Sequence, residues 1–176
     1  MLDTKPNIQS LDARVAELLD RMTLPEKIGQ MNQIDPGGEA HDARLQEDVR
    51  AGRIGAILNE VDADALNELQ RIAREESRLG IPLLVGRDVI HGFKTVLPIP
   101  LGLAATWDPD LVRDGTRVAA REAAAAGINW TFAPMIDIAR DPRWGRIAES
   151  FGEDPCLCSR LGVASIEGFQ GADLSL

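Results

Sequence analysis

Residues 128–155 read INWTFAPMIDIARDPRWGRIAESFGEDP, and this stretch decides the fold that we expect. It begins with an apolar run, residues 128–133, that is typical of a buried strand. A long polar loop, residues 137–154, follows, and Pro155 is a favoured first residue of a helix with Asp154 as its cap. The loop therefore joins the C-terminal end of a strand to a helix, where α/β folds place binding and catalytic groups.

The polar loop combines three arginines before Ile147, several carboxylates and one large aromatic side chain, Trp144. This mixture suits a pocket that grips a polyhydroxylated ligand, because guanidinium and carboxylate groups can both bind hydroxyls. The same residues also suit a salt-bridged surface loop, since structural ion pairs are common in such segments. Residue types alone leave both interpretations open.

Length and charge bound the class of protein. The chain has 176 residues, enough for one domain with a sizeable core, and 44% of them are hydrophobic. The net charge of −9 argues against a nucleic-acid or anionic-membrane partner, which would require a basic face. No apolar run approaches the roughly 20 residues of a membrane span. A neutral polar ligand fits this composition better.

Two local features bear on the cellular compartment. Residues 1–10 lack a basic region followed by an apolar stretch, so no signal peptide is visible. We expect a periplasmic or secreted location if a leader was removed, and a cytoplasmic location otherwise. Cys156 and Cys158 lie two residues apart in an expected helix, a spacing that disfavours a disulfide. We expect two buried or half-buried thiols there, and no metal site.

Residues 1–52 are expected to form a helical lead-in. Apolar residues between Leu11 and Met22 fall on one helical face. Thr23 and Glu26 then have the spacing of a capping box that opens a second helix. A third helix is expected over residues 40–51.

Beyond the lead-in, strands and helices alternate. The pattern predicts strands at residues 54–58, 81–85 and 128–133, followed by helices over 62–79, 108–126 and 155–170. Pro98 and Pro100 predict that the chain near them is irregular. This alternation predicts an α/β fold with a parallel sheet and right-handed crossovers. No glycine-rich phosphate-binding motif follows a strand, so a nucleotide-binding fold is not supported.

A second candidate loop follows the second of these strands. Asp88 would stand at the end of the sheet, with His91 and Lys94 beyond it. A carboxylate there can accept hydrogen bonds from two neighbouring sugar hydroxyls, and a lysine can donate one. Alternatively, Asp88 caps a turn and His91 is a structural histidine. A metal site at Asp88 and His91 would lack a third ligand.

Several motifs together make the sequence resemble the N-terminal domain of glycoside hydrolase family three, the β-glucosidase-like enzymes. The match spans nearly the whole chain in the right order. Its runs are MTLPEKIGQM at 22–31, GRDVIHG at 86–92, PIPLG at 98–102, AATWD at 104–108, NWTFAP at 129–134, and residues 140–146 with Glu149 and Phe151.

The resemblance implies a (β/α)₈ TIM-barrel-type domain and retaining hydrolysis of terminal β-D-glucosyl residues, with no cofactor. It also implies that Asp88 and Arg146 bind the sugar, and that Lys94 assists. It assigns no nucleophile and no acid/base residue within this chain. Neither Asp137 nor Asp141 is assigned as the nucleophile.

A complete barrel needs about 200 residues or more, so we expect this chain to be the first half of the barrel plus the N-terminal helices. The remainder of the barrel and a second domain are then the expected partners, together with a β-glucoside or β-linked gluco-oligosaccharide. The alternative is a catalytically incomplete sugar-binding module. Exposed sheet edges would also favour self-association.

Overall fold

The computed structural model describes residues 8–171, and the side chains from residue 11 onward. The first seven residues lie outside it. They make up most of residues 1–10, the segment in which the sequence shows no signal peptide. The strands are β1 (Gln33–Ile34), β2 (Ala56–Leu58), β3 (Leu84–Arg87) and β4 (Trp130–Thr131). The helices are α1 (Ile8–Arg21), α2 (Leu24–Gln30), α3 (Ala43–Arg50), α4 (Ala63–Arg71), α5 (Pro100–Ala104), α6 (Pro109–Ala125) and α7 (Pro155–Gln170).

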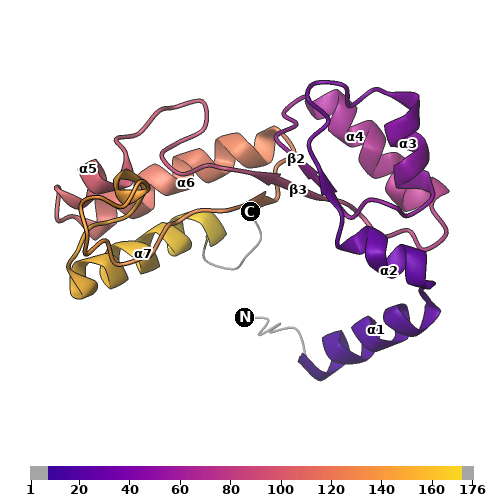
Figure 1. Ribbon diagram of the computed structural model, residues 1–176, viewed down its shortest axis with the longest axis horizontal. Helices are drawn as coiled ribbons and strands as arrows, with labels where there is room; N and C mark the ends of the chain where they lie inside the picture. The colour runs from indigo at the N-terminus through magenta and orange to yellow at the C-terminus, as the bar shows by residue number, and fades with distance from the viewer. Residues whose placement is uncertain (1–7, 172–176) are drawn as a thin grey trace, which may run out of the picture.

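The four strands form one parallel sheet in the order β1-β2-β3-β4. Ile57 pairs with Val85, and Gly86 pairs with Trp130. The predicted parallel α/β sheet is therefore confirmed. Figure 1 shows α3 and α4 packed beside β2 and β3, while α5, α6 and α7 gather beyond the other side of the sheet.

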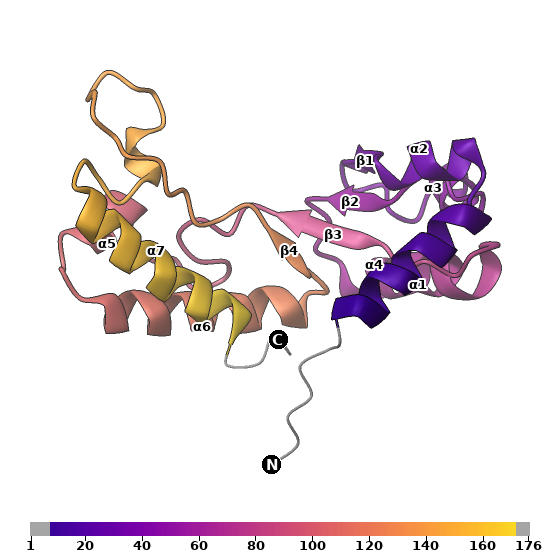
Figure 2. The ribbon, with the colours of Figure 1, turned by 90° about the horizontal axis from the view of Figure 1, so that it is seen from below.

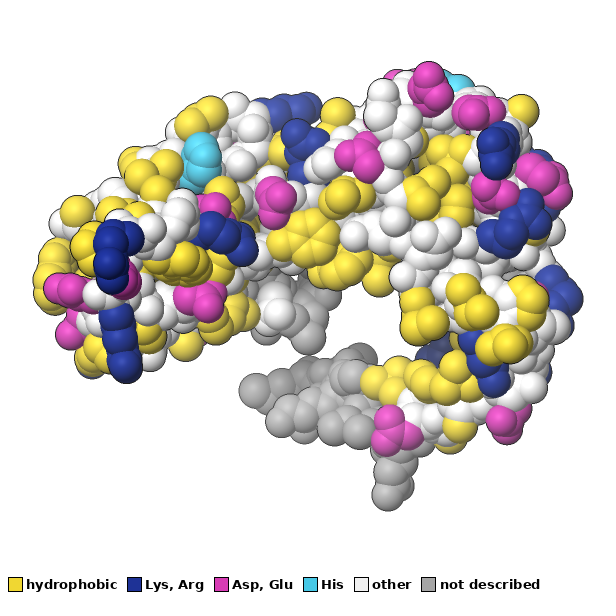
Figure 3. All heavy atoms as spheres, in the orientation of Figure 1, with side chains coloured by type: hydrophobic (Ala, Val, Ile, Leu, Met, Phe, Trp, Pro, Cys, Tyr) yellow, Lys and Arg dark blue, Asp and Glu magenta, His cyan; other side chains and the backbone are white. Residues whose placement is uncertain are grey.

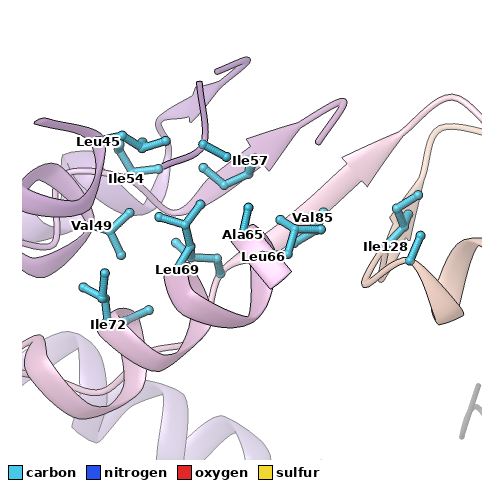
Figure 4. Close-up of a cluster of buried hydrophobic side chains, with 14 of the residues drawn as sticks. Leu45, Val49, Ile54, Ile57, Ala65, Leu66, Leu69, Ile72, Val85 and Ile128 are labelled. Carbon is cyan, nitrogen blue, oxygen red and sulfur yellow. The ribbon is translucent and has the colours of Figure 1, made fainter. Parts of the chain in front are cut away.

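The main core lies between the sheet and α3 and α4. Ile57, Leu69, Ile72 and Val85 are fully buried there. Figure 4 shows these side chains converging from β2, β3 and the helices, with Val85 directed toward α4. Burying an aliphatic side chain of this size contributes about 1.5–3 kcal/mol. This core holds the strand ends, and hence the loops that follow them, in fixed relative positions.

The predicted helix starts are confirmed where a side chain caps the backbone. Thr23 and Glu26 form both halves of the capping box of α2. Asp62, Asp108 and Asp154 accept hydrogen bonds from the first backbone N–H groups of α4, α6 and α7. Each contact satisfies a donor that has no partner within the helix.

Two elements differ from the predictions. A strand, β1, lies within the segment predicted to be a helical lead-in, and it pairs with β2 although only two residues long. The expectation of an irregular segment around Pro98 and Pro100 is wrong at α5, because Pro100 occupies the first turn of that helix, where a proline needs no N–H donor.

Some element boundaries and one cysteine also differ. The helix that begins with α4 continues as a π-helical turn, Ile72–Glu76, and ends before Gly80. β4 occupies only two residues of the predicted 128–133 run. Both cysteines are free, as expected, but Cys156 is exposed while Cys158 is buried. Within residues 8–171, no helix is long and apolar enough to cross a membrane.

α6 and α7 pack against each other along their lengths (Figure 2). The contact is close because Gly168 of α7 faces the backbone of α6: a Cβ there would lie 2.5 Å from the Arg113 carbonyl oxygen. A second buried cluster, including Val112 and Leu161, fills the space between these helices and α5. The long polar loop connects β4 to α7 across this unit.

Candidate functional site

Asp88 and Arg146 line the same cavity, although they lie far apart in the sequence. The cavity has a volume of about 340 Å³, within the range of small-ligand sites. Its other walls come from the start of α5 and the segment after Arg146. The complete lining is Asp88, Ile90, His91, Ile99, Pro100, Arg146, Ala148 and Glu149. The site therefore combines two carboxylates, one guanidinium group, a histidine and an apolar wall.

Asp88 directly follows Arg87, the last residue of β3, so the sheet fixes its backbone position. The turn that it opens closes as a hairpin: the Leu97 N–H donates to the His91 carbonyl at 2.8 Å, and Gly92 pairs with Val96. Gly92 has φ 101°, and a Cβ there would lie 2.0 Å from the Thr95 carbonyl oxygen. A side chain at this position would therefore break the turn.

His91 is used by the hairpin. Its Nδ1 lies 3.2 Å from the Leu97 carbonyl oxygen, so this nitrogen carries the proton and donates. The ring is half-buried and contributes to the cavity wall. This geometry agrees with the structural role that the sequence left open for His91. Among the described residues, no cluster of three or more His, Cys, Asp or Glu side chains could hold a metal ion.

Arg146 is oriented by Glu149, three residues later. The Nε and Nη2 atoms of Arg146 lie 3.0 and 2.6 Å from Glu149 Oε2. This hydrogen-bonded pair raises the pKa of Arg146, with smaller contributions from the Asp137 and Asp88 carboxylates, and lowers the pKa of Glu149. The guanidinium therefore stays charged. The Arg146 side chain is largely exposed, so water screens this pair, and exchanging a contact with Glu149 for a ligand hydroxyl costs little.

Lys94 lies apart from this pair. It is exposed and does not line the cavity; its backbone N–H donates to Glu122 Oε2 at 2.8 Å. Thr95 adds two donors to the same carboxylate, at 2.8 and 2.6 Å. These bonds lower the pKa of Glu122 and fasten the hairpin to α6. The structure thus brings Asp88 and Arg146 together and leaves Lys94 at the hairpin tip.

Two supporting carboxylates were not identified as site residues from the sequence. Glu149 has a signal, since Arg146 and Glu149 are three residues apart and could meet on a helical turn; the structure has a short 3-10 helix there, Ile147–Glu149. Glu122 carries no such signal. It lies in the last turn of α6, and only the tertiary fold brings it to the hairpin.

Another cavity, of about 300 Å³, lies between α6, α7 and β4, and the described residues that line it are all uncharged. It includes Ala120, Ile128, Pro134, Ile166 and Phe169. Without a titratable group it offers no proton transfer or charged hydrogen bond. The cavity around Asp88 is the better candidate site, because charged side chains line it.

Comparisons with known proteins agree with this fold. The sequence profile described as the glycosyl hydrolase family 3 N terminal domain matches residues 23–175. A periplasmic beta-glucosidase of Salmonella typhimurium is 45% identical over 163 residues, covering 93% of this chain and 21% of that protein. A beta-xylosidase of Formosa agariphila is 35% identical over 179 residues, covering 96% of this chain and 20% of that protein.

Solved structures give the same result. A crystal structure of a beta-glucosidase from Listeria innocua in complex with glucose superposes with a TM-score of 0.79 and 41% sequence identity, covering 91% of this chain and 24% of that chain. The predicted TIM-barrel-type α/β fold is confirmed. This chain spans about a fifth of the length of the curated relatives described above.

Proposed function

The chain belongs to glycosyl hydrolase family 3, and on that premise we propose that it supplies the glucose-binding side of a retaining β-glucosidase-like active site. The observation that carries this proposal is the shared cavity of Asp88 and Arg146. Relatives named beta-glucosidase and beta-xylosidase support a terminal β-linked sugar as the substrate class.

In this proposal Asp88 accepts hydrogen bonds from two neighbouring hydroxyls of the terminal sugar. Arg146 donates to the same ring, and Glu149 keeps its guanidinium aimed at the cavity. Holding the sugar in one orientation is the contribution that these groups make to the rate. Lys94 remains a predicted assistant, placed on the same hairpin but outside the cavity wall.

Retaining hydrolysis needs a nucleophilic carboxylate and a second carboxyl group that donates and removes the proton. We assign neither to this chain. Asp141 is bound to Arg143 by hydrogen bonds of 2.9 and 2.6 Å, and neither Asp141 nor Asp137 lines the cavity. We propose that both catalytic groups come from the remainder of the barrel and a second domain, and that residues 1–176 form the N-terminal part of that barrel.

A chimera tests this function. Residues 11–171 would replace the matching segment of the Salmonella typhimurium beta-glucosidase, and hydrolysis of an aryl β-glucoside would be measured. We expect turnover in the chimera, and a loss in kcat/KM of about a hundredfold or more for Asp88→Ala or Arg146→Ala. Asp141→Ala is the matched control and should retain activity. A folded chimera indifferent to Asp88→Ala would contradict the proposed site.

The second candidate function is a catalytically incomplete sugar-binding or self-associating module. The exposed inner face of the sheet, formed by Leu84, Trp130 and Phe132, favours association in particular. Calorimetric titration of the 176-residue chain with glucose and cellobiose separates the candidates. Millimolar or tighter binding that disappears in Asp88→Ala would favour the module.

A further inference from the structure

Arg87 immediately precedes Asp88 but has a different role. Its side chain does not line the cavity that Asp88 shares with Arg146. Instead, its Nη1 donates to the carbonyl oxygen of Asn59 at 3.1 Å. Its guanidinium carbon lies 5.7 Å from the centre of the Phe93 ring, within the range of a cation–π contact. One side chain therefore joins the segment after β2 to the hairpin after β3.

Asn59 extends this connection to β1. It has φ 64°, a left-handed conformation that few residues other than glycine and asparagine adopt. Its backbone N–H donates to the Gly86 carbonyl at 3.0 Å, and its Nδ2 donates to Asp35 Oδ2 at 2.8 Å. The result is a chain of contacts, Asp35–Asn59–Arg87–Phe93, across the C-terminal ends of three neighbouring strands.

Charge supports the same arrangement. The Asn59 amide and the Gly37 N–H hydrogen-bond to Asp35 and lower the pKa of its carboxyl, and the Arg87 charge adds to this effect. Asp35 is therefore an anion that faces the cation of Arg87 across Asn59. Asp88 lines the cavity and Arg87 does not, so the two side chains do not compete for the same ligand.

We propose that Arg87 is a positioning residue that fixes the turn from which Asp88 reaches the sugar. It does so from outside the cavity. Its side chain connects the residue before Asp88 to Asn59, and also to Phe93, which follows Asp88 in the hairpin. The inference rests on the proposed sugar-binding role of Asp88. A displacement of about 1 Å in a group that orients the substrate can lower a rate about a hundredfold, so the effect is measurable.

A double-mutant cycle in the chimera distinguishes positioning from general stabilisation. We expect Arg87→Met to lower kcat/KM about tenfold when Asp88 is present, and less than about twofold in the Asp88→Asn background. Arg87→Lys should recover part of the loss, because an ammonium group can still donate to Asn59 and approach the Phe93 ring. Arg53→Met, which removes an arginine paired with Asp48 away from the cavity, is the control.

Three results would overturn the inference: unchanged activity in Arg87→Met, equal losses in both backgrounds, or no recovery with Arg87→Lys. If Asp88→Asn itself has no effect, the proposed function fails instead, so the two failures are distinguishable. Should Arg87→Met not fold, Phe93→Leu replaces it, since leucine keeps an apolar contact with the core but removes the ring. We again expect kcat/KM to fall only when Asp88 is present. An unchanged kcat/KM would contradict the positioning role.

Discussion

Glu26 illustrates how one side chain can hold distant segments together. Its carboxylate accepts the Thr23 backbone N–H at 2.8 Å, which closes the capping box of α2. The Nε of Arg78, from the segment after the π-helical turn, donates to the other oxygen at 2.8 Å. The bond from Arg78, followed by that from Thr23, lowers the pKa of Glu26 from 4.5 to about 2.

This depressed pKa predicts a specific pH dependence for Glu26→Gln. A group whose pKa is lower in the folded state stabilises the fold above its ordinary pKa, and that stabilisation is lost as pH falls toward the folded pKa. We expect Glu26→Gln to lower the urea midpoint at pH 7, and the difference from the parent chain to shrink between pH 4.5 and about pH 2.

Urea unfolding followed by circular dichroism at several pH values measures this difference. Glu75→Gln is the matched control, because the Glu75 side chain is 68% exposed and its carboxylate approaches Arg71 only to 3.7 Å. It should leave the midpoint nearly unchanged throughout. A difference for Glu26→Gln that stays constant down to pH 2 would exclude the Arg78 pair as its cause.

Residues of the candidate site could be predicted from the sequence only where their position in the chain fixes their position in space. Asp88 and Arg146 each follow a predicted strand, and the ends of parallel strands meet at one edge of a sheet. Glu122 and Arg87, which contact the hairpin that begins at Asp88, act through contacts made only after folding. Periodicity and spacing carry no information about such contacts.

At the scale of elements, the packing of α6 on α7 depends on Gly168. A Cβ at this position would lie 1.9 Å from the Thr116 Oγ1 and 2.5 Å from the Arg113 carbonyl oxygen. The hydroxyl could rotate away, but the backbone carbonyl of α6 cannot move without shifting the helix. The two helices therefore require the absence of a side chain here.

We predict that Gly168→Ala destabilises the fold by about 1–3 kcal/mol through overpacking. Alanine is a better helix former than glycine by about 0.5–1 kcal/mol, so the steric effect must exceed this gain. Urea unfolding measures the net result. Gly145→Ala, where a Cβ would meet nothing within 4 Å, is the control. Equal or greater stability in Gly168→Ala would show that the helices can separate at no cost.

Helices with a local cap were predictable, and elements defined by their partners were not. Asp62, Asp108 and Asp154 each mark a helix start because the capping side chain lies next to the N–H groups that it binds. β1 has only two residues and no apolar run of its own. It is a strand because β2 offers it hydrogen-bonding partners, which is a property of the sheet and not of the segment.

The whole molecule exposes the face of its sheet that is opposite α3 and α4. Leu84 is 50% exposed, and Trp130 and Phe132 are 39% and 40% exposed. They border Gly86, where a Cβ would lie 3.0 Å from the Phe132 ring and 3.4 Å from the Trp130 ring. Figure 3 shows hydrophobic surface between the two groups of helices. Apolar surface of this kind favours association with another protein surface.

We therefore predict that the 176-residue chain self-associates, and that Leu84→Lys weakens this association. Leu84 alternates with the buried Val85, so it shares the open face of the sheet with Gly86. A lysine at position 84 therefore places a charge on the apolar surface without entering the core.

Light scattering after size exclusion should show a mass that rises with protein concentration for the parent chain and less so for Leu84→Lys. Val163→Lys, at a similarly exposed position on α7, should behave as the parent chain does. A parent chain that remains monomeric at every concentration would contradict the prediction, and so would an equal effect of the two substitutions.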